Sequence, residues 1–352
     1  MGCDPDKLAK AIGGPGRLLI VTHDNPDPDA LVTAAALARF ASATADVKSR
    51  ICCEGVVGRA ENRALKRELR LKLMDATRVS WKRWPKIALV DCQPGTGNNA
   101  FPEKRAPDVV LDHHPLRKST RARMTDVRSD YGACATLMAE YLQAASISVP
   151  SDLAAGLCYA IASETQDLSR DAGAADAEAY MRLYQQADKK MLSRIMHPQL
   201  QQEYFSTLAR ALRAAMTHGN IVIAHLDEVT HPDSVGLVAD LLLQRIRITW
   251  SLVTGVWKGD LYISLRTERG YAHAGRILRR VLGARGSGGG HSAMAGGRAT
   301  LKGLDAQKKR ELPGQLAQRL IRIVTRRKDA SLKPLLDDGA AASVCKPLKR
   351  DV

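Results

Sequence analysis

Three short apolar runs in the first third of the chain are each followed by acidic or histidine side chains. These runs are residues 17–21, 86–90 and 109–111. Their length and their richness in Val, Ile and Leu are typical of buried strands in a parallel sheet. The carboxyl ends of such strands meet at one edge of an open sheet, where α/β proteins bind ligands. The pattern therefore predicts an α/β fold, with a mainly parallel sheet flanked by helices and a polar site at that edge.

The turn after the first run carries three side chains that can bind a metal ion. These are His23, Asp27 and Asp29, and two prolines among them restrict the backbone so that the aspartates are presented. An alternative is that Asp29 only caps a helix that starts near Ala30. Capping accounts for one of these residues and leaves the other two unexplained.

The other two runs end in the same kinds of side chain. Asp91 directly follows the second run, and Asp112, His113 and His114 follow the third, with Pro115 next. Because parallel strands deliver such side chains to one edge of the sheet, we expect them to join those of the first turn in one cluster.

The chemistry of the cluster predicts its ligand and its reaction. Carboxylate oxygens and imidazole nitrogens, with no cysteine among them, suit Mn²⁺ or Mg²⁺ better than a structural zinc ion. The number of these groups exceeds the needs of one ion. Two ions roughly 3.5–4 Å apart, bridged by a carboxylate and a water, activate that water and hold a phosphoryl group for in-line attack. We therefore expect hydrolysis of a phosphoester with two Mn²⁺ or Mg²⁺ ions as cofactors.

The order and spacing of these residues resemble the first three motifs of the DHH phosphoesterases. The matching motifs are His23-x3-Asp27-x-Asp29, Asp91 and Asp112-His113-His114. The fourth motif of the family is an aspartate after a short helix, commonly followed by threonine and then by an apolar residue. The matching position here is Glu164, which keeps the register of Thr165 and Leu168. We favour Glu164 as the fourth-motif ligand, and Asp167 is the alternative.

The resemblance implies that this set of residues holds two metal ions. One ion would be bound by the histidine and the first aspartate of the first motif. The other would be bound by the last aspartate of that motif and the first histidine of the triplet. Asp91 would bridge the ions, and Glu164 would complete the set. The implied metal ligands are His23, Asp27, Asp29, Asp91, His113 and Glu164.

The remaining two residues of the triplet are the implied catalytic residues. Asp112 resembles a residue that orients the neighbouring imidazoles. His114 resembles one that contacts the scissile phosphate.

A second resemblance lies in the C-terminal half. Residues 285–291, which end in Gly-Gly-Gly-His, resemble the glycine-rich loop of the DHHA1 domain, a substrate-binding domain that often follows a DHH domain. Consecutive glycines let backbone N–H groups approach a phosphate closely. A strand is predicted over residues 261–266 and ends on Arg266. The resemblance implies that this arginine binds substrate, and the alternative is that it is a solvated residue at the end of the strand. The implied substrate-binding residues are Arg266, Gly288, Gly289, Gly290 and His291.

The length of 352 residues fits two domains that each bury a core. We expect a DHH domain over residues 1–190, a helical connector over 191–219, a smaller α/β DHHA1 domain over 220–330 and a flexible tail over 331–352. Residues 191–352 hold 26 basic and 13 acidic side chains, whereas residues 1–190 hold 27 and 24. A basic second lobe suits a polyanionic substrate that is gripped at one end and cut at the other. Solvated helix faces are the alternative for its densest basic clusters.

The composition narrows the substrate. Aromatic residues make up 4% of the chain, too few for an extended base-stacking track. The resemblance is to stand-alone DHH-DHHA1 proteins, and it implies Mn²⁺-dependent cleavage of short RNA or linear dinucleotides such as pApA and pGpG to mononucleotides. It also implies a 3′-phosphatase activity on pAp. The alternatives are another hydrolase, such as a cyclic dinucleotide phosphodiesterase or a pyrophosphatase, and a nucleotide-binding protein with impaired catalysis.

The sequence also bears on location and partners. No apolar run approaches the roughly 20 residues of a membrane helix. The seven cysteines are odd in number and lack paired spacing, which argues against a disulfide framework. We therefore expect a cytoplasmic protein that binds a short RNA or dinucleotide and no membrane, with a homodimer left open.

Overall fold

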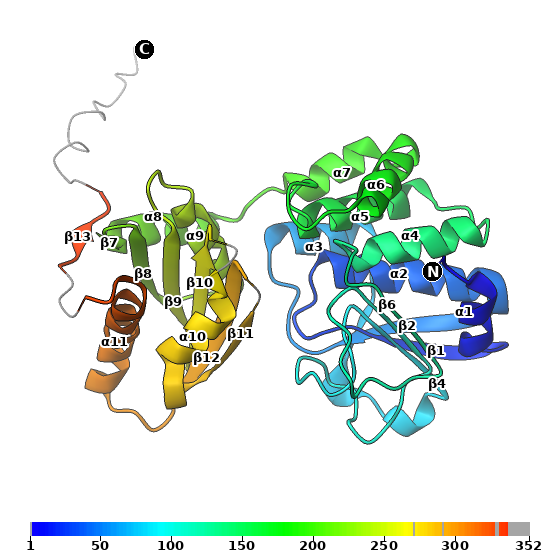
Figure 1. Ribbon diagram of the computed structural model, residues 1–352, viewed down its shortest axis with the longest axis horizontal. Coiled ribbons are helices and arrows are strands. Elements are labelled where there is room, and N and C mark those ends of the chain that lie inside the picture. Colours follow the sequence, from blue (N-terminus) through cyan, green and yellow to red (C-terminus); the bar gives the residue numbers. More distant parts are fainter. Residues whose placement is uncertain (1, 270–271, 291, 328–330, 337–352) are drawn as a thin grey trace, which may run out of the picture. The chain divides into compact units, whose positions relative to one another are not determined.

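A computed structural model gives the fold of the chain and describes residues 2–269, 272–290, 292–327 and 331–336 (Figure 1). The chain divides into two compact units, Met1–Gln199 and Leu200–Val352. Each unit has its own sheet and its own hydrophobic core. In the described part of the chain, no helix is long and apolar enough to cross a membrane.

The first unit is built on a six-stranded sheet in which all neighbouring strands run parallel, in the order β3-β2-β1-β4-β5-β6. The strands are β1 (Gly16–Val21), β2 (Val47–Cys53), β3 (Leu73–Asp75), β4 (Lys86–Val90), β5 (Val109–Asp112) and β6 (Met124–Val127). The predicted parallel sheet is confirmed, and the three apolar runs are β1, β4 and β5. Because the strand order reverses between β1 and β4, their carboxyl ends flank the switch point at which α/β sheets bind ligands.

Helices cover one face of this sheet in layers (Figure 1). They are α1 (Pro5–Ile12), α2 (Pro28–Ala45), α3 (Ala60–Glu68), α4 (Cys134–Ala144), α5 (Ser151–Glu164), α6 (Ala174–Gln186) and α7 (Lys189–Met196). Helix α2 packs against β2 and is covered by α4 and α5, while α6 and α7 pack outside α5. Because α2 lies between the sheet and other helices, it is buried on most sides, which explains its apolar, alanine-rich sequence.

Strand β1 points its side chains into two different hydrophobic clusters. Leu18 and Ile20 belong to the large cluster that includes α2, α4 and α5. Leu19 and Val21 belong to a smaller cluster on the other face, together with Trp84. Burial on both faces explains why this strand is a continuous apolar run rather than an alternating one.

The second unit contains a seven-stranded sheet in the order β11-β12-β10-β9-β8-β7-β13, in which β8 and β9 run parallel and the other neighbours antiparallel. Its strands are β7 (Met216–His218), β8 (Ile221–Glu228), β9 (Trp250–Trp257), β10 (Asp260–Thr267), β11 (Ser287–Gly290), β12 (Met294–Thr300) and β13 (Lys333–Pro334). Helices α8 (Gln202–Ala214) and α9 (Asp233–Leu243) bury one core cluster, and α10 (Ala274–Leu282) and α11 (Ala306–Thr325) bury another. The expected α/β second unit is thus observed.

The stretch predicted as a helical connector, residues 191–219, is divided between the two units. Helix α7 packs against α3 and α5 in the first unit, whereas α8 packs against β8 and α9 in the second. Of the predicted tail, residues 331–336 are described, and β13 within them pairs with β7. Residues 337–352 lie outside the described part of the chain.

Candidate metal centre

His23 and Asp27 lie in the turn between β1 and α2. Asp27 is the N-cap of α2, and its Oδ1 accepts a hydrogen bond of 3.0 Å from the backbone N–H of Ala30. The alternative in which Asp29 caps this helix is wrong, because Pro28 occupies the first helical position and the cap must precede it. The Nδ1 of His23 donates to the carbonyl of Asp24 at 2.9 Å. Its Nε2 therefore faces the site.

Asp29 is buried and is held by the start of another helix. Its two carboxylate oxygens accept hydrogen bonds of 2.7 Å each from the backbone N–H groups of Cys134 and Ala135. Its Oδ2 also lies 3.7 Å from the Nε2 of His113. Thr33 also donates to Oδ1, at 3.4 Å, so Oδ2 is the oxygen that keeps a lone pair for a metal ion.

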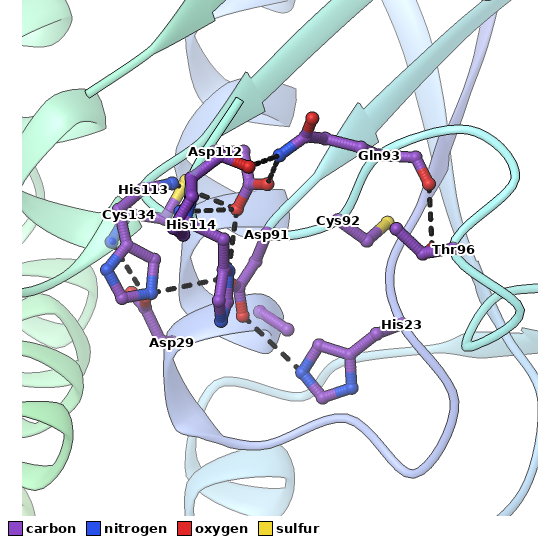
Figure 2. A network of polar contacts seen from close by, with 12 residues as sticks. His23, Asp29, Asp91, Cys92, Gln93, Thr96, Asp112, His113, His114 and Cys134 are labelled. Atoms are coloured by element: carbon purple, nitrogen blue, oxygen red, sulfur yellow. Dashed lines mark hydrogen bonds and ion pairs between the residues drawn. The ribbon is translucent and has the colours of Figure 1, made fainter. Parts of the chain in front are cut away.

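Asp91 lies at the centre of the cluster (Figure 2). Its Oδ2 is 3.4 Å from the Nε2 of His23, and its Oδ1 is 3.4 Å from the Nε2 of His113. The residue is 3% exposed and adopts a left-handed backbone conformation, with φ of 54°. That conformation is uncommon for a residue other than glycine and is concentrated at functional sites. The backbone strain therefore agrees with a site at this position.

Asp112 holds both histidines that follow it. Its Oδ1 accepts hydrogen bonds from the backbone N–H groups of His113 and His114, at 2.9 and 3.3 Å, and from the Nδ1 of His114 at 2.9 Å. The Nδ1 of His113 lies 3.2 Å from the carbonyl of Tyr131 and donates to it. The imidazole of His113 therefore turns Nε2 toward Asp91, whereas the nitrogen of His114 near Asp91 is Nδ1.

Two groups of side chains bring potential ligand atoms within 4.8 Å of one another. One comprises Asp91, His113 and His114, and the other comprises His23, Asp27 and Asp91. Asp91 belongs to both groups, so it is the residue that would contact both ions if each group held one. The nitrogen of His114 near Asp91 is Nδ1, at 3.6 Å, and it already donates to Asp112. The nitrogen of His113 near Asp91 is Nε2, which leaves His113 the better placed of the two as a ligand.

Three features of this cluster fit a divalent cation. The donors are carboxylate oxygens and imidazole nitrogens, which suit Mn²⁺ or Mg²⁺. His23 and His113 each donate from Nδ1 to a backbone carbonyl and turn Nε2 inward, as metal-binding histidines do. The buried Oδ1 of Asp91 has no hydrogen-bond partner among the described residues, and a cation would satisfy it.

The pKa values of these groups show how crowded the negative charge is. Burial lowers the pKa of His113, but Asp91 and Asp29 outweigh it and raise the pKa to about 11. Burial also lowers the pKa of His23, but the carboxylates of Asp27 and Asp91 outweigh it. The pKa of His23 is therefore raised well above its ordinary value. Without metal ions, protons on these imidazoles neutralise the carboxylates. A divalent cation can take over that role.

Glu164, at the end of α5, faces the same cluster. Burial, followed by the charges of Asp27 and Asp91, raises its pKa to about 7. Asp167, the alternative fourth-motif ligand, is exposed and lies between two other residues of positive φ in a left-handed turn. The geometry therefore favours Glu164 over Asp167 as a ligand.

In the second unit, Arg266 is held in an ion pair. Its Nε lies 2.5 Å from Oδ1 of Asp240, and its Nη1 donates to the carbonyls of Leu265 and Ala295. The side chain is 12% exposed, so the alternative of a freely solvated strand end is wrong. The other basic candidate, His291, lies outside the described residues.

The expected glycine-rich loop is a strand. Residues 287–290 form β11 at the edge of the sheet and pair with β12, with Gly288 opposite Gly297. A Cβ atom at Gly288 would lie 2.8 Å from Leu282 of α10, and one at Gly297 would lie 2.9 Å from the same side chain. Packing explains why these residues are glycines, since they let α10 lie close against β11 and β12.

Two known families of domain match the parts of the chain that form the parallel sheet and the mixed sheet. Residues 17–161 match the DHH family, N-terminal domain, and residues 218–320 match the DHHA1 domain. The chain belongs to the DHH phosphoesterase family and carries a DHHA1 domain in the same polypeptide. Members of this family are metal-dependent phosphoesterases or nucleases.

Similar proteins come from archaea and bacteria. The uncharacterized protein MJ1633 of Methanocaldococcus jannaschii is 32% identical over 306 residues, which cover 87% of this chain and 62% of the relative. An exopolyphosphatase-related protein from Bacteroides fragilis has a TM-score of 0.71 at 13% identity and covers 92% of this chain and 96% of its own. RecJ from Thermus thermophilus, solved in complex with Mn²⁺, has a TM-score of 0.52 at 16% identity and covers 93% of this chain and 55% of its own. The two structures are similar to this chain in fold.

Proposed function

We propose that the protein is a Mn²⁺-dependent phosphodiesterase that hydrolyses short oligoribonucleotides or linear dinucleotides to nucleoside monophosphates. The observation that carries the proposal is the position of Asp91, which is shared by both groups of potential metal ligands at the switch point of a parallel sheet. A shared carboxylate is what a pair of metal ions requires.

The proposed metal ligands come from four segments of the chain. They are His23, Asp27, Asp29, Asp91, His113 and Glu164, with Asp91 between the two ions. Two divalent cations, when bound, supply positive charge to the phosphoryl oxygens and lower the pKa of a water molecule. The RecJ structure named above was solved with Mn²⁺, which supports Mn²⁺ as the metal to test first.

The chain's own residues contribute orientation and charge. Asp112 fixes the Nδ1 of His114, so the imidazole keeps one orientation beside the cluster and can contact a phosphate oxygen. In the second unit, Arg266, the glycines of β11 and His291 are proposed to bind the rest of the substrate. The excess of basic residues in the C-terminal half supports a polyanionic substrate.

The scarcity of aromatic residues supports a short substrate. An activity on pAp as a 3′-phosphatase is proposed alongside, since it needs the same phosphoester chemistry. We also propose a cytoplasmic location, and a homodimer is an arrangement to test by light scattering.

A substrate panel tests the proposal. The protein is incubated with Mn²⁺ and pApA, pGpG, cyclic dinucleotides, longer RNA, pyrophosphate or pAp, and products are read by chromatography. We expect mononucleotides from the linear dinucleotides at the highest rate. If a cyclic dinucleotide or pyrophosphate is hydrolysed fastest, that compound becomes the assigned substrate. If no compound is hydrolysed, the proposal that the protein is an enzyme is refuted.

A further inference from the structure

Gln93 is a buried amide that bridges the segments following β4 and β5. It is 2% exposed and lies two residues after Asp91. Its Nε2 lies 2.6 Å from Oδ2 of Asp112 and 3.3 Å from the carbonyl oxygen of Pro115. Its Oε1 lies 2.9 Å from the backbone nitrogen of Arg117 and 2.7 Å from Oγ1 of Thr120. All four positions around the amide are therefore occupied.

These neighbours determine which way the amide points. The backbone N–H of Arg117 can only donate, so the atom facing it must be the oxygen. The carbonyl of Pro115 can only accept, so the atom facing it must be the NH₂ group. The NH₂ group consequently donates to Asp112 as well (Figure 2).

Gln93 completes the hydrogen bonding of the Asp112 carboxylate. The Oδ1 of Asp112 is used by His113 and His114, and its Oδ2 is used by Gln93. Contacts at both oxygens therefore fix the orientation of this carboxylate. Because the Oδ1 of Asp112 accepts from the Nδ1 of His114, that nitrogen keeps its proton, and the neutral imidazole carries its lone pair on Nε2.

We propose that Gln93 is a positioning residue for the phosphoester hydrolysis proposed above, because its amide holds Asp112 in the orientation that fixes the Nδ1–H tautomer of His114. The kinetic consequence rests on the proposed function. The effect on the tautomer does not, since it follows from hydrogen bonds within the protein.

The chemistry of the position requires glutamine. Glutamate has the same shape and can accept from Arg117 and Thr120, but its second oxygen would meet Oδ2 of Asp112. Neither carboxylate oxygen donates to the other, so Asp112 would lose the hydrogen bond that holds its Oδ2. Methionine has a similar length but neither donates to Asp112 nor accepts well from Arg117.

The experiment compares Gln93→Met and Gln93→Glu with Asn99→Ala. Asn99 is the matched control because its Nδ2 donates to the carbonyl oxygen of Gln93 and to Thr96, so it ties the same loop without touching Asp112. We expect both Gln93 variants to lower kcat on the best linear dinucleotide by about 10–100-fold and to change KM by less than about threefold. Asn99→Ala should keep kcat within about twofold of the unaltered protein.

Two further readouts separate positioning from a purely structural role. If Gln93 acts through His114, then Gln93→Met should cause no additional loss of kcat in a protein that already carries His114→Ala. Nitrogen chemical shifts of the His114 imidazole, measured in the metal-free protein at alkaline pH, should report the Nδ1–H tautomer in the unaltered chain and a mixture of tautomers in Gln93→Met.

The outcomes decide the inference. Full activity in Gln93→Met, an equal loss of kcat with and without His114, or an unchanged tautomer in a folded Gln93→Met would overturn it. If the unaltered protein hydrolyses none of the substrates, the proposed function fails, and the tautomer measurement alone decides the role of Gln93.

Discussion

The carboxylate of Asp29 accepts a hydrogen bond of 2.7 Å from the backbone N–H of Cys134, a residue 105 positions further along the chain. The N-cap position of α4 is Ala133, which cannot supply a capping side chain. Asp29 supplies that cap from the start of α2, while its Oδ2 also approaches His113. One carboxylate thus joins the start of α2 to the start of α4 and also lies beside His113.

This double use predicts that Asp29→Ala destabilises the protein even without metal ions. Two buried backbone N–H groups would lose their acceptors, and we expect the free energy of unfolding to fall by about 1–3 kcal/mol. Denaturant unfolding in the presence of a chelator measures it. Asp167→Asn, at an exposed position whose left-handed backbone asparagine also tolerates, is the control and should change stability by no more than about 0.5 kcal/mol. Equal stability of Asp29→Ala and the unaltered chain would show that the cap is dispensable.

The raised pKa values of His23 and His113 predict that Mn²⁺ affinity rises with pH. Both imidazoles carry protons at neutral pH in the metal-free protein, and metal binding must release them because a ligating nitrogen needs its lone pair. Glu164, with a pKa of about 7, adds a further proton in acidic solution. Affinity should therefore fall as pH decreases through the neutral range.

Calorimetric titration with Mn²⁺ in two buffers of different ionisation enthalpy counts the protons released. His197→Gln, which changes a histidine remote from the cluster in sequence, should leave the pH dependence unaltered. An affinity that does not vary with pH would contradict the assignment of His23 and His113 as ligands.

The choice between Glu164 and Asp167 can be made with two neutral variants. Glu164→Gln should reduce metal-dependent activity about 10–100-fold and weaken Mn²⁺ binding, because its carboxylate faces Asp27 and Asp91. Asp167→Asn should retain activity within about twofold, since its side chain is exposed. Steady-state kinetics at saturating Mn²⁺ provide the test, and the reverse result would assign the fourth motif to Asp167.

The parts of the fold that the sequence predicts are those with local signals. The strands β1, β4 and β5 are buried on both faces and therefore appear as apolar runs, which in turn locate Asp91 and the triplet. The sequence does not indicate that β11 is a strand, because glycines carry no apolar pattern, and the closeness of α10 explains why glycines are there.

The contacts that complete the site could not be predicted because they join segments distant in sequence. Gln93 has no reactive chemistry of its own, and its role becomes visible only when Asp112 and Thr120 lie beside it. The same holds for the two backbone N–H groups that bind Asp29. Sequence spacing located the ligands, whereas the groups that orient them required the fold.

The packing of α10 on β11 predicts that alanine destabilises the protein at one glycine and not at another. A Cβ atom at Gly275 would come closer than van der Waals contact to the backbone of Gly290, whereas no described atom lies within 4 Å of a Cβ at Gly289. In a helix, Gly→Ala alone stabilises by up to about 1 kcal/mol. Because the backbone of β11 must shift, we expect the overpacking cost of about 1–3 kcal/mol to exceed that gain for Gly275→Ala.

Thermal unfolding and kinetics on the two variants test this packing. Gly275→Ala should lower the melting temperature and raise KM for a linear dinucleotide, since it displaces the strand proposed to bind substrate. Gly289→Ala should leave the melting temperature nearly unchanged. A rise in its KM would then indicate that the added methyl group interferes directly with substrate binding at β11. A Gly275→Ala protein that is more stable than the unaltered chain would mean that β11 yields easily, and the close approach of α10 would not be what requires its glycines.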